Sequence, residues 1–130
     1  MSNATFRAAR ILFIALAWLF AVSIALQVFF AGLALFVDSK SWVAHAGFAR
    51  YVAPLPLLMA LCAWGARLPV RLRMRSVGLF GMVIGMFLTA VLSSRIGALS
   101  ALHPVIALLL FWSSAEILRA FHRPASPSSS

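Results

Sequence analysis

The stretch ILFIALAWLFAVSIALQVFFAGLALFV, from Ile11 to Val37, runs for 27 residues without a charged side chain. A helix needs about 20 mainly apolar residues to cross the roughly 30 Å hydrocarbon layer of a bilayer, so this stretch is long enough to span a membrane. Its backbone must be helical there, because irregular backbone facing lipid would leave N–H and C=O groups without hydrogen bonds. We therefore interpret the chain as an integral membrane protein.

Three more apolar stretches follow: about His45 to Ala66 (interrupted only by Arg50), Ser76 to Ser94, and about His103 to Leu118. The last is short, and it reaches both membrane interfaces only if Arg119 and Phe121 anchor it there. The sequence predicts an all-α, transmembrane, up-and-down four-helix bundle that forms a single domain over residues 1–123. The segment PASPSSS at residues 124–130 has no apolar pattern and predicts a flexible cytoplasmic tail.

Composition and charge placement support a membrane location. Hydrophobic residues make up 64% of the chain, charged residues 10%, and the mean hydropathy is +1.04, which leaves too little polar surface for a water-soluble globule. If the helices alternate, eight of the eleven basic residues fall on one side: Arg7, Arg10, Arg67, Arg71, Arg73, Arg75, Arg119 and Arg123. The positive-inside rule then makes both termini cytoplasmic in a bacterial inner membrane. We interpret the formal charge of +9 as serving orientation and contact with anionic membrane lipids, not nucleic-acid binding.

Two histidines stand out as a candidate site. His45 and His103 open the second and fourth predicted helices at the same, outer face of the membrane. In an up-and-down bundle these helices are diagonal neighbours, so inward side chains from them meet across the bundle axis. Pro104 favours the first helical position, which predicts His103 at the N-cap or close to it.

Small residues near both histidines suit a flat ligand. Gly47 and Ala49 follow His45, and Ala107 follows His103 by four residues. The pattern predicts a haem b site with His45 and His103 as axial metal ligands, lined by these three residues. Arg50, with Lys40 and Arg95, could pair with the haem propionates. Helix three adds a stripe of small residues, which suits close helix packing equally well: Gly78, Gly81, Gly85 and Thr89.

Other chemistry is less well supported by the sequence. A histidine at a membrane interface is often satisfied simply by water or a backbone carbonyl, and Gln27 needs a hydrogen-bond partner within the bundle. Zinc or copper would want three or four ligands, whereas the outer face adds only Asp38 to the two histidines. No carboxylate lies at the centre of a span, and no serine, histidine and acid set or glycine-rich phosphate loop is present. Proton-coupled transport and hydrolysis are therefore disfavoured.

Three segments carry a resemblance to known proteins: QVFFAGLALF (27–36), WVAHAG (42–47) and LHPVIALLLF (102–111). They resemble an uncharacterised bacterial family of small four-helix membrane proteins, and the Leu-His-Pro-Val opening of helix four is the most specific piece. That family often has Asn where this chain has Ile106, and a glutamine in helix three where this chain has the stretch from Met82 to Met86. The resemblance implies a fold but no activity.

A more distant likeness is architectural. One histidine at the outer end of helix two and one at the outer end of helix four is similar to the haem-binding half of the haem A synthase family and to membrane b-type cytochromes. This likeness implies that His45 and His103 are axial ligands. Two functions remain open: a haem-binding electron-transfer subunit that works near the outer face with a redox partner, or a non-catalytic accessory subunit of a larger membrane complex. The sequence does not decide whether the chain is an enzyme, and it favours a non-enzymatic subunit.

Overall fold

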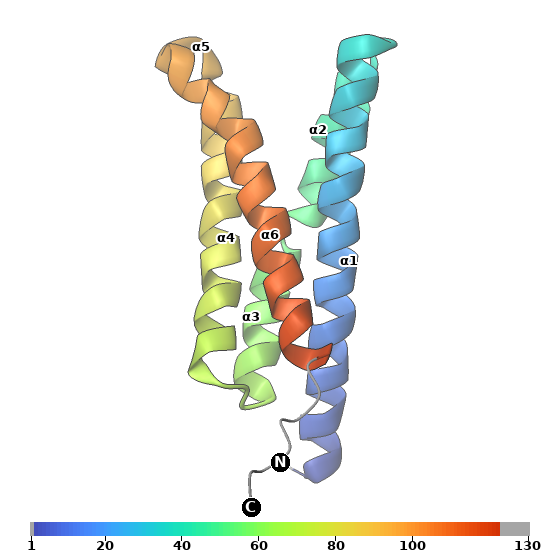
Figure 1. Ribbon diagram of the computed structural model, residues 1–130, viewed down its shortest axis with the longest axis vertical. Helices are drawn as coiled ribbons and strands as arrows, with labels where there is room; N and C mark the ends of the chain where they lie inside the picture. The colour runs from blue at the N-terminus through green and yellow to red at the C-terminus, as the bar shows by residue number, and fades with distance from the viewer. Residues whose placement is uncertain (1, 123–130) are drawn as a thin grey trace, which may run out of the picture.

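The four predicted spans are confirmed by the computed structural model, which describes residues 2–122 and contains four helices long and apolar enough to cross a membrane (Figure 1). No strand occurs within residues 2–122. The predicted tail at 124–130 lies outside the described residues. The helices are α1 (Asn3–Phe36), α2 (Ser41–Val52), α3 (Leu55–Gly65), α4 (Val70–Val91), α5 (Ser93–Ile96) and α6 (Leu102–His122), and a 3-10 turn (Gly97–Ala101) joins the last two.

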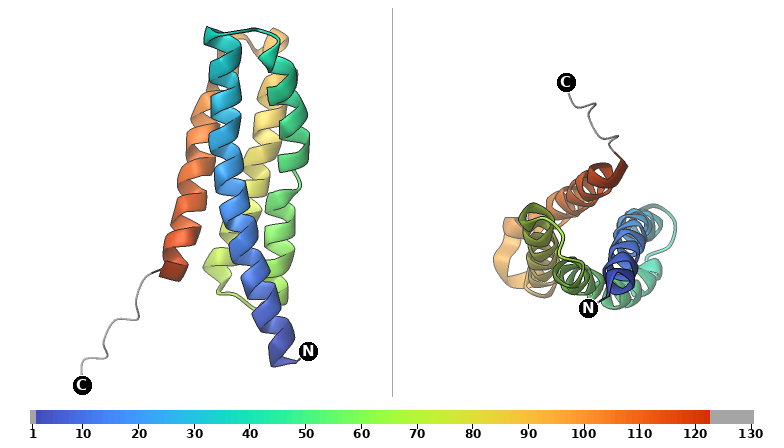
Figure 2. Two further views of the ribbon diagram at one scale, coloured as in Figure 1. Left: turned by 90° about the vertical axis from the view of Figure 1, so that its right-hand side faces the viewer. Right: turned by 90° about the horizontal axis from the view of Figure 1, so that it is seen from below.

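The spans form a closed ring of neighbours. The first span, α1, packs against α2, α3 and α6, and α4 packs against α3 and α6. The second span (α2 with α3) and the fourth (α6) are therefore diagonal, as the up-and-down arrangement requires. The first turn of α1, the last turn of α6 and the turn between α3 and α4 lie at one end of the bundle (Figures 1 and 2). We call this the terminal end, and the opposite end the histidine end.

Two helices begin earlier than the apolar pattern predicts. The first helix starts at Asn3 instead of Ile11, because the Ser2 side chain accepts a hydrogen bond from the N–H of Thr5 and caps it. The third span, α4, starts at Val70 instead of Ser76, since arginine is a good helix former and nothing after Pro69 breaks the helix. Three arginines before the apolar stretch therefore lie on the first turns of α4: Arg71, Arg73 and Arg75.

The second span breaks between α2 and α3, next to two prolines. Pro54 and Pro56 have no N–H to donate to the carbonyls of Arg50 and Val52, so the helix cannot continue regularly through Ala53. The break changes the direction of the span about midway (Figure 2). It separates the part that carries His45 from the part that packs in the core.

The tightly packed core lies toward the terminal end. Its fully buried large side chains are Phe13, Phe20, Met59, Leu79, Leu110 and Ile117. Ser76 and Ser114 are buried with them, and each hydroxyl donates to the carbonyl of its own helix four residues earlier, at 3.0 and 2.7 Å. Toward the histidine end α1 and α6 diverge (Figure 1). The half of the bundle nearer the histidine end, which we call the histidine half, is therefore less densely packed than the other half.

Candidate functional site

The structure brings His45 and His103 together across the bundle. Their ring centroids lie 6.3 Å apart, with the ring planes inclined at 55°. His45 comes from the first half of α2 and His103 from the first turn of α6, and both side chains are half-buried. The diagonal arrangement of the second and fourth spans thus places two imidazoles close together, in a tilted arrangement, toward the histidine end.

Each imidazole is anchored to a different helix through its Nδ1 atom. His45 Nδ1 lies 3.0 Å from the backbone oxygen of Gln27 on α1, and His103 Nδ1 lies 3.1 Å from the backbone oxygen of Met86 on α4. A carbonyl oxygen can only accept, so Nδ1 carries the hydrogen in both rings. In the neutral imidazole this leaves Nε2 without a hydrogen and free to coordinate a metal. The same second-nitrogen bond holds most metal-binding histidines in place.

A threonine completes the anchor of His103. Thr89 Oγ1 lies 3.1 Å from His103 Nδ1, 3.0 Å from the Gly85 carbonyl and 2.9 Å from the Met86 carbonyl. Because its single hydrogen goes to a carbonyl of its own helix, the threonine oxygen accepts from the imidazole. His45 has an aromatic neighbour instead, since the Trp42 ring packs edge-on against it at 5.5 Å. Both rings are thus oriented by fixed groups.

Two local predictions at this site need correction. His103 lies close to the N-cap position but not at it, because the 3-10 turn leads directly into α6, which begins at Leu102. Its side chain is therefore free to reach α4. The side-chain partner predicted for Gln27 is also not found, since its Oε1 atom is buried without a hydrogen bond. The backbone carbonyl of Gln27, not its amide, contacts His45.

The residues predicted to line the site differ in exposure. Gly47, Ala49 and Ala107 are half-buried, whereas Arg50 is exposed on α2. The glycine stripe on α4 does not act as one surface. Gly85 approaches α6, where a Cβ atom would lie 3.7 Å from Ile106, while the exposed positions are Gly78 and Gly81, where a Cβ atom would meet nothing within 4 Å.

Comparison with known proteins adds a family but no activity. The family of unknown function DUF6220 matches residues 27–93, just over half of the chain. The chain belongs to this family. The DUF6220 region includes His45 and the two residues of α4 that anchor the other imidazole, Met86 and Thr89, but it ends before His103. No curated protein and no solved structure matches the chain.

Sequence reasoning missed three of the anchoring groups in this DUF6220 protein: the carbonyls of Gln27 and Met86 and the hydroxyl of Thr89. The sequence does indicate the depth of these groups in the membrane. Each histidine pairs with a residue of the preceding span, which runs antiparallel to its own span and is connected to it at the histidine end. The spacing gives only the depth. It does not give the helix rotation that decides which carbonyl meets the ring.

Proposed function

We propose that this protein is a small b-type membrane cytochrome, an electron-transfer subunit in which His45 and His103 are the axial ligands of a haem. The spacing of the two rings is the observation that carries the proposal. Two metal–nitrogen bonds of about 2 Å, with about 1 Å from each nitrogen to its ring centre, place the centroids of two axial imidazoles about 6 Å apart. The observed separation is 6.3 Å.

The metal ligands that the protein offers also fit a haem. Within residues 2–122 no three histidine, cysteine or acidic side chains gather closely enough to hold a bare metal ion. A haem brings four nitrogens of its own, so two imidazoles complete its iron. Both rings already present Nε2 as the free nitrogen, because Nδ1 donates to a carbonyl in each. When bound, haem supplies one-electron transfer, with a potential tuned by its axial ligands and their hydrogen bonds.

The surroundings support a ligand in the histidine half. Three residues near the histidines, Gly47, Ala49 and Ala107, are small and only half-buried, in contrast to the closed core at the other end. The buried Gln27 Oε1 lacks a hydrogen-bond donor, which is costly in a protein interior and is relieved only by a bound molecule that donates a hydrogen bond, such as water. Arg50 is the charged side chain of α2 and is our candidate partner for the propionates.

The charge distribution predicts how the protein is oriented in the membrane. With the arginine-rich terminal end in the cytoplasm of a bacterium, the two histidines lie toward the outer face of the inner membrane. The partner would then be a redox protein or a larger complex that exchanges electrons at that face.

Absorbance spectroscopy tests this function directly. The full chain is expressed with a haem supply, purified in mild detergent and examined by reduced-minus-oxidised difference spectra. We expect a b-type spectrum that is lost in His45→Ala and in His103→Ala. The matched control is His122→Ala, because His122 bonds the Leu118 carbonyl at the far end of α6 and its loss should leave the spectrum intact.

The opposite result is equally clear. A purified protein that is helical by circular dichroism, monodisperse, colourless and unable to take up added haemin would contradict the haem proposal. That outcome would favour the second candidate, a non-catalytic accessory subunit. The observation in favour of the accessory role is the exposed, unpacked surface at Gly78 and Gly81 on α4, where small residues would let a helix of a partner approach closely.

A further inference from the structure

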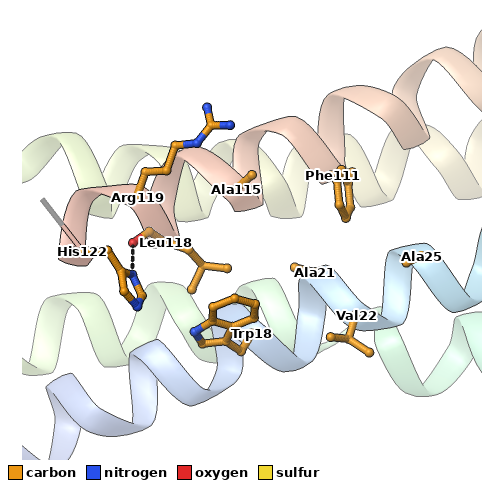
Figure 3. A pocket seen from close by; sticks show the side chains of 9 residues that line it. All are labelled: Trp18, Ala21, Val22, Ala25, Phe111, Ala115, Leu118, Arg119 and His122. Atoms are coloured by element: carbon orange, nitrogen blue, oxygen red, sulfur yellow. Dashed lines mark hydrogen bonds between the residues drawn. The ribbon is translucent and has the colours of Figure 1, made fainter.

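A second feature lies away from the histidines, on the lipid-facing side of α1 and α6. A groove of about 520 Å³ runs between these helices (Figure 3). Its walls are almost entirely apolar and include Trp18, Ala21 and Ala25 of α1 and Phe111, Ala115 and Leu118 of α6. The alanines leave the space between the two helices unfilled, so we call this feature the α1/α6 groove.

The groove has the length of one membrane leaflet. Along α6 its lining runs from Phe111 to His122, a distance of about 16 Å at the rise of an α-helix. Half of the hydrocarbon layer of a bilayer is about 15 Å thick. An apolar groove of this length, open toward lipid, matches an acyl chain that extends from headgroup depth toward the midplane.

The terminal end of the α1/α6 groove is polar and aromatic. The His122 ring reaches toward α1 and packs edge-on against Trp18 at 6.2 Å, while its Nδ1 donates to the Leu118 carbonyl at 2.8 Å (Figure 3). Tryptophan and arginine are typical of the depth at which lipid headgroups begin. The groove therefore changes from apolar to polar where an acyl chain would meet its headgroup.

Two cations lie near the terminal end of the two helices. Arg119 lines the groove, with its side chain extending away from α1 (Figure 3), whereas Arg10 lies outside the lining. The Arg10 guanidinium of α1 lies 5.4 Å from the Phe121 ring, and that of Arg119 on α6 lies 5.5 Å from the Trp112 ring. Arg119 also pairs with Glu116 through Nη1, which leaves its other N–H groups available. The described residues at the terminal end include one acidic side chain, Glu116, and seven arginines: Arg7, Arg10, Arg67, Arg71, Arg73, Arg75 and Arg119.

We propose that the α1/α6 groove is a binding site for an anionic phospholipid. One acyl chain lies along the alanine side of the groove, and the phosphate lies at the polar end, held by Arg10 and Arg119. The excess of positive charge selects a headgroup with a net negative charge over a zwitterionic one. This site is independent of the haem proposal, because it shares no residue with the histidine pair.

Native mass spectrometry of the full chain tests the proposal. The detergent-solubilised protein is titrated with phosphatidylglycerol or with phosphatidylcholine that carries the same two oleoyl chains. We expect phosphatidylglycerol to bind more tightly, and Arg10→Gln and Arg119→Gln each to weaken its binding about five-fold, the effect of one cation near a membrane surface. The matched charge control, Arg95→Gln at the histidine end, should change nothing.

A second variant tests the apolar part. Ala115→Leu fills the groove and should abolish the tight binding, whereas Ala90→Leu, on an exposed position of α4, should not. Circular dichroism and size-exclusion chromatography verify that both variants fold. Equal affinity for the two lipids, or binding unaffected by Ala115→Leu in a folded protein, would overturn the proposal. So would a dimer whose cross-links join the α1/α6 grooves of two copies, because a second chain would then occupy the groove.

Discussion

Thr89 and His103 meet between two spans, with 3.1 Å from the threonine Oγ1 to the imidazole Nδ1. Thr89→Val keeps the shape of the side chain but removes this acceptor, and leaves the Met86 carbonyl as the only anchor of the ring. Loss of such an outer hydrogen bond typically weakens metal binding 10–100-fold. We expect a haem affinity about 10-fold lower, at the low end of this range, because one anchor remains. Haemin titration of the purified protein measures it.

Thr5→Val is the control for that prediction. Thr5 has its own side-chain hydrogen bond, to Ser2, but at the terminal end of α1. Its loss should leave haem affinity unchanged. If Thr89→Val binds haem as tightly as the unaltered chain, the threonine does not orient His103.

The sequence predicts the spans better than it predicts the site. Four apolar stretches predict the number of membrane spans, and the up-and-down order predicts which of them are diagonal, so the meeting of His45 and His103 follows from topology. The tautomer of the rings does not follow. It depends on the rotation of α1 and α4 about their axes, which sets whether the carbonyls of Gln27 and Met86 face the imidazoles. Packing against neighbouring helices decides that rotation, and apolar residues face lipid as well as protein.

Hydropathy also does not predict where the helices begin or which glycines contact a neighbouring helix. Hydropathy marks where a segment enters the apolar layer, but α4 extends into the arginine-rich region because helix propensity, not hydropathy, decides where it begins. A spacing of four between Gly81 and Gly85 suggests one packing surface. In the structure the two glycines have different environments, since only Gly85 is close to a neighbouring helix.

That difference gives a prediction about α4. Gly85→Leu should force α4 and α6 apart, because even a Cβ atom there would lie 3.7 Å from Ile106. Overpacking typically costs about 1–3 kcal/mol, which outweighs the roughly 1 kcal/mol gained in helix propensity. Gly81→Leu faces open space and should not destabilise the isolated protein. Unfolding titrations in mixed micelles compare the two variants. Equal destabilisation by both would mean that Gly81 is packed in the purified protein, as in a self-associated form.

Truncation of a core side chain should lower the free energy of unfolding less in this protein than in a water-soluble protein. Phe20 is fully buried and Phe36 is 87% exposed, although both belong to α1. Phe20→Ala should lower the free energy of unfolding by about 2 kcal/mol, below the ~3–5 kcal/mol of soluble cores, because lipid replaces much of the lost apolar environment. Phe36→Ala is the matched control and should have little effect. A similar loss in both variants would contradict the placement of the core.

The orientation of the bundle determines where any electron transfer takes place. Seven of the described arginines lie at the terminal end, and the positive-inside rule assigns that end to the cytoplasm. We expect Ser39→Cys, beside α2, to react with a membrane-impermeant thiol reagent in intact cells, and Arg71→Cys, on α4, to react only after permeabilisation. Both variants need a Cys62→Ala background, because Cys62 is a free thiol in α3.

Equal labelling of the two positions in permeabilised cells is the control for their accessibility. Labelling of Arg71→Cys from outside, with Ser39→Cys protected, would reverse the orientation. The histidine pair would then lie near the cytoplasmic face, and a redox partner would have to be sought on that side. Labelling of both positions in intact cells would indicate that the chain inserts in two orientations, so that no single face could be assigned to the partner.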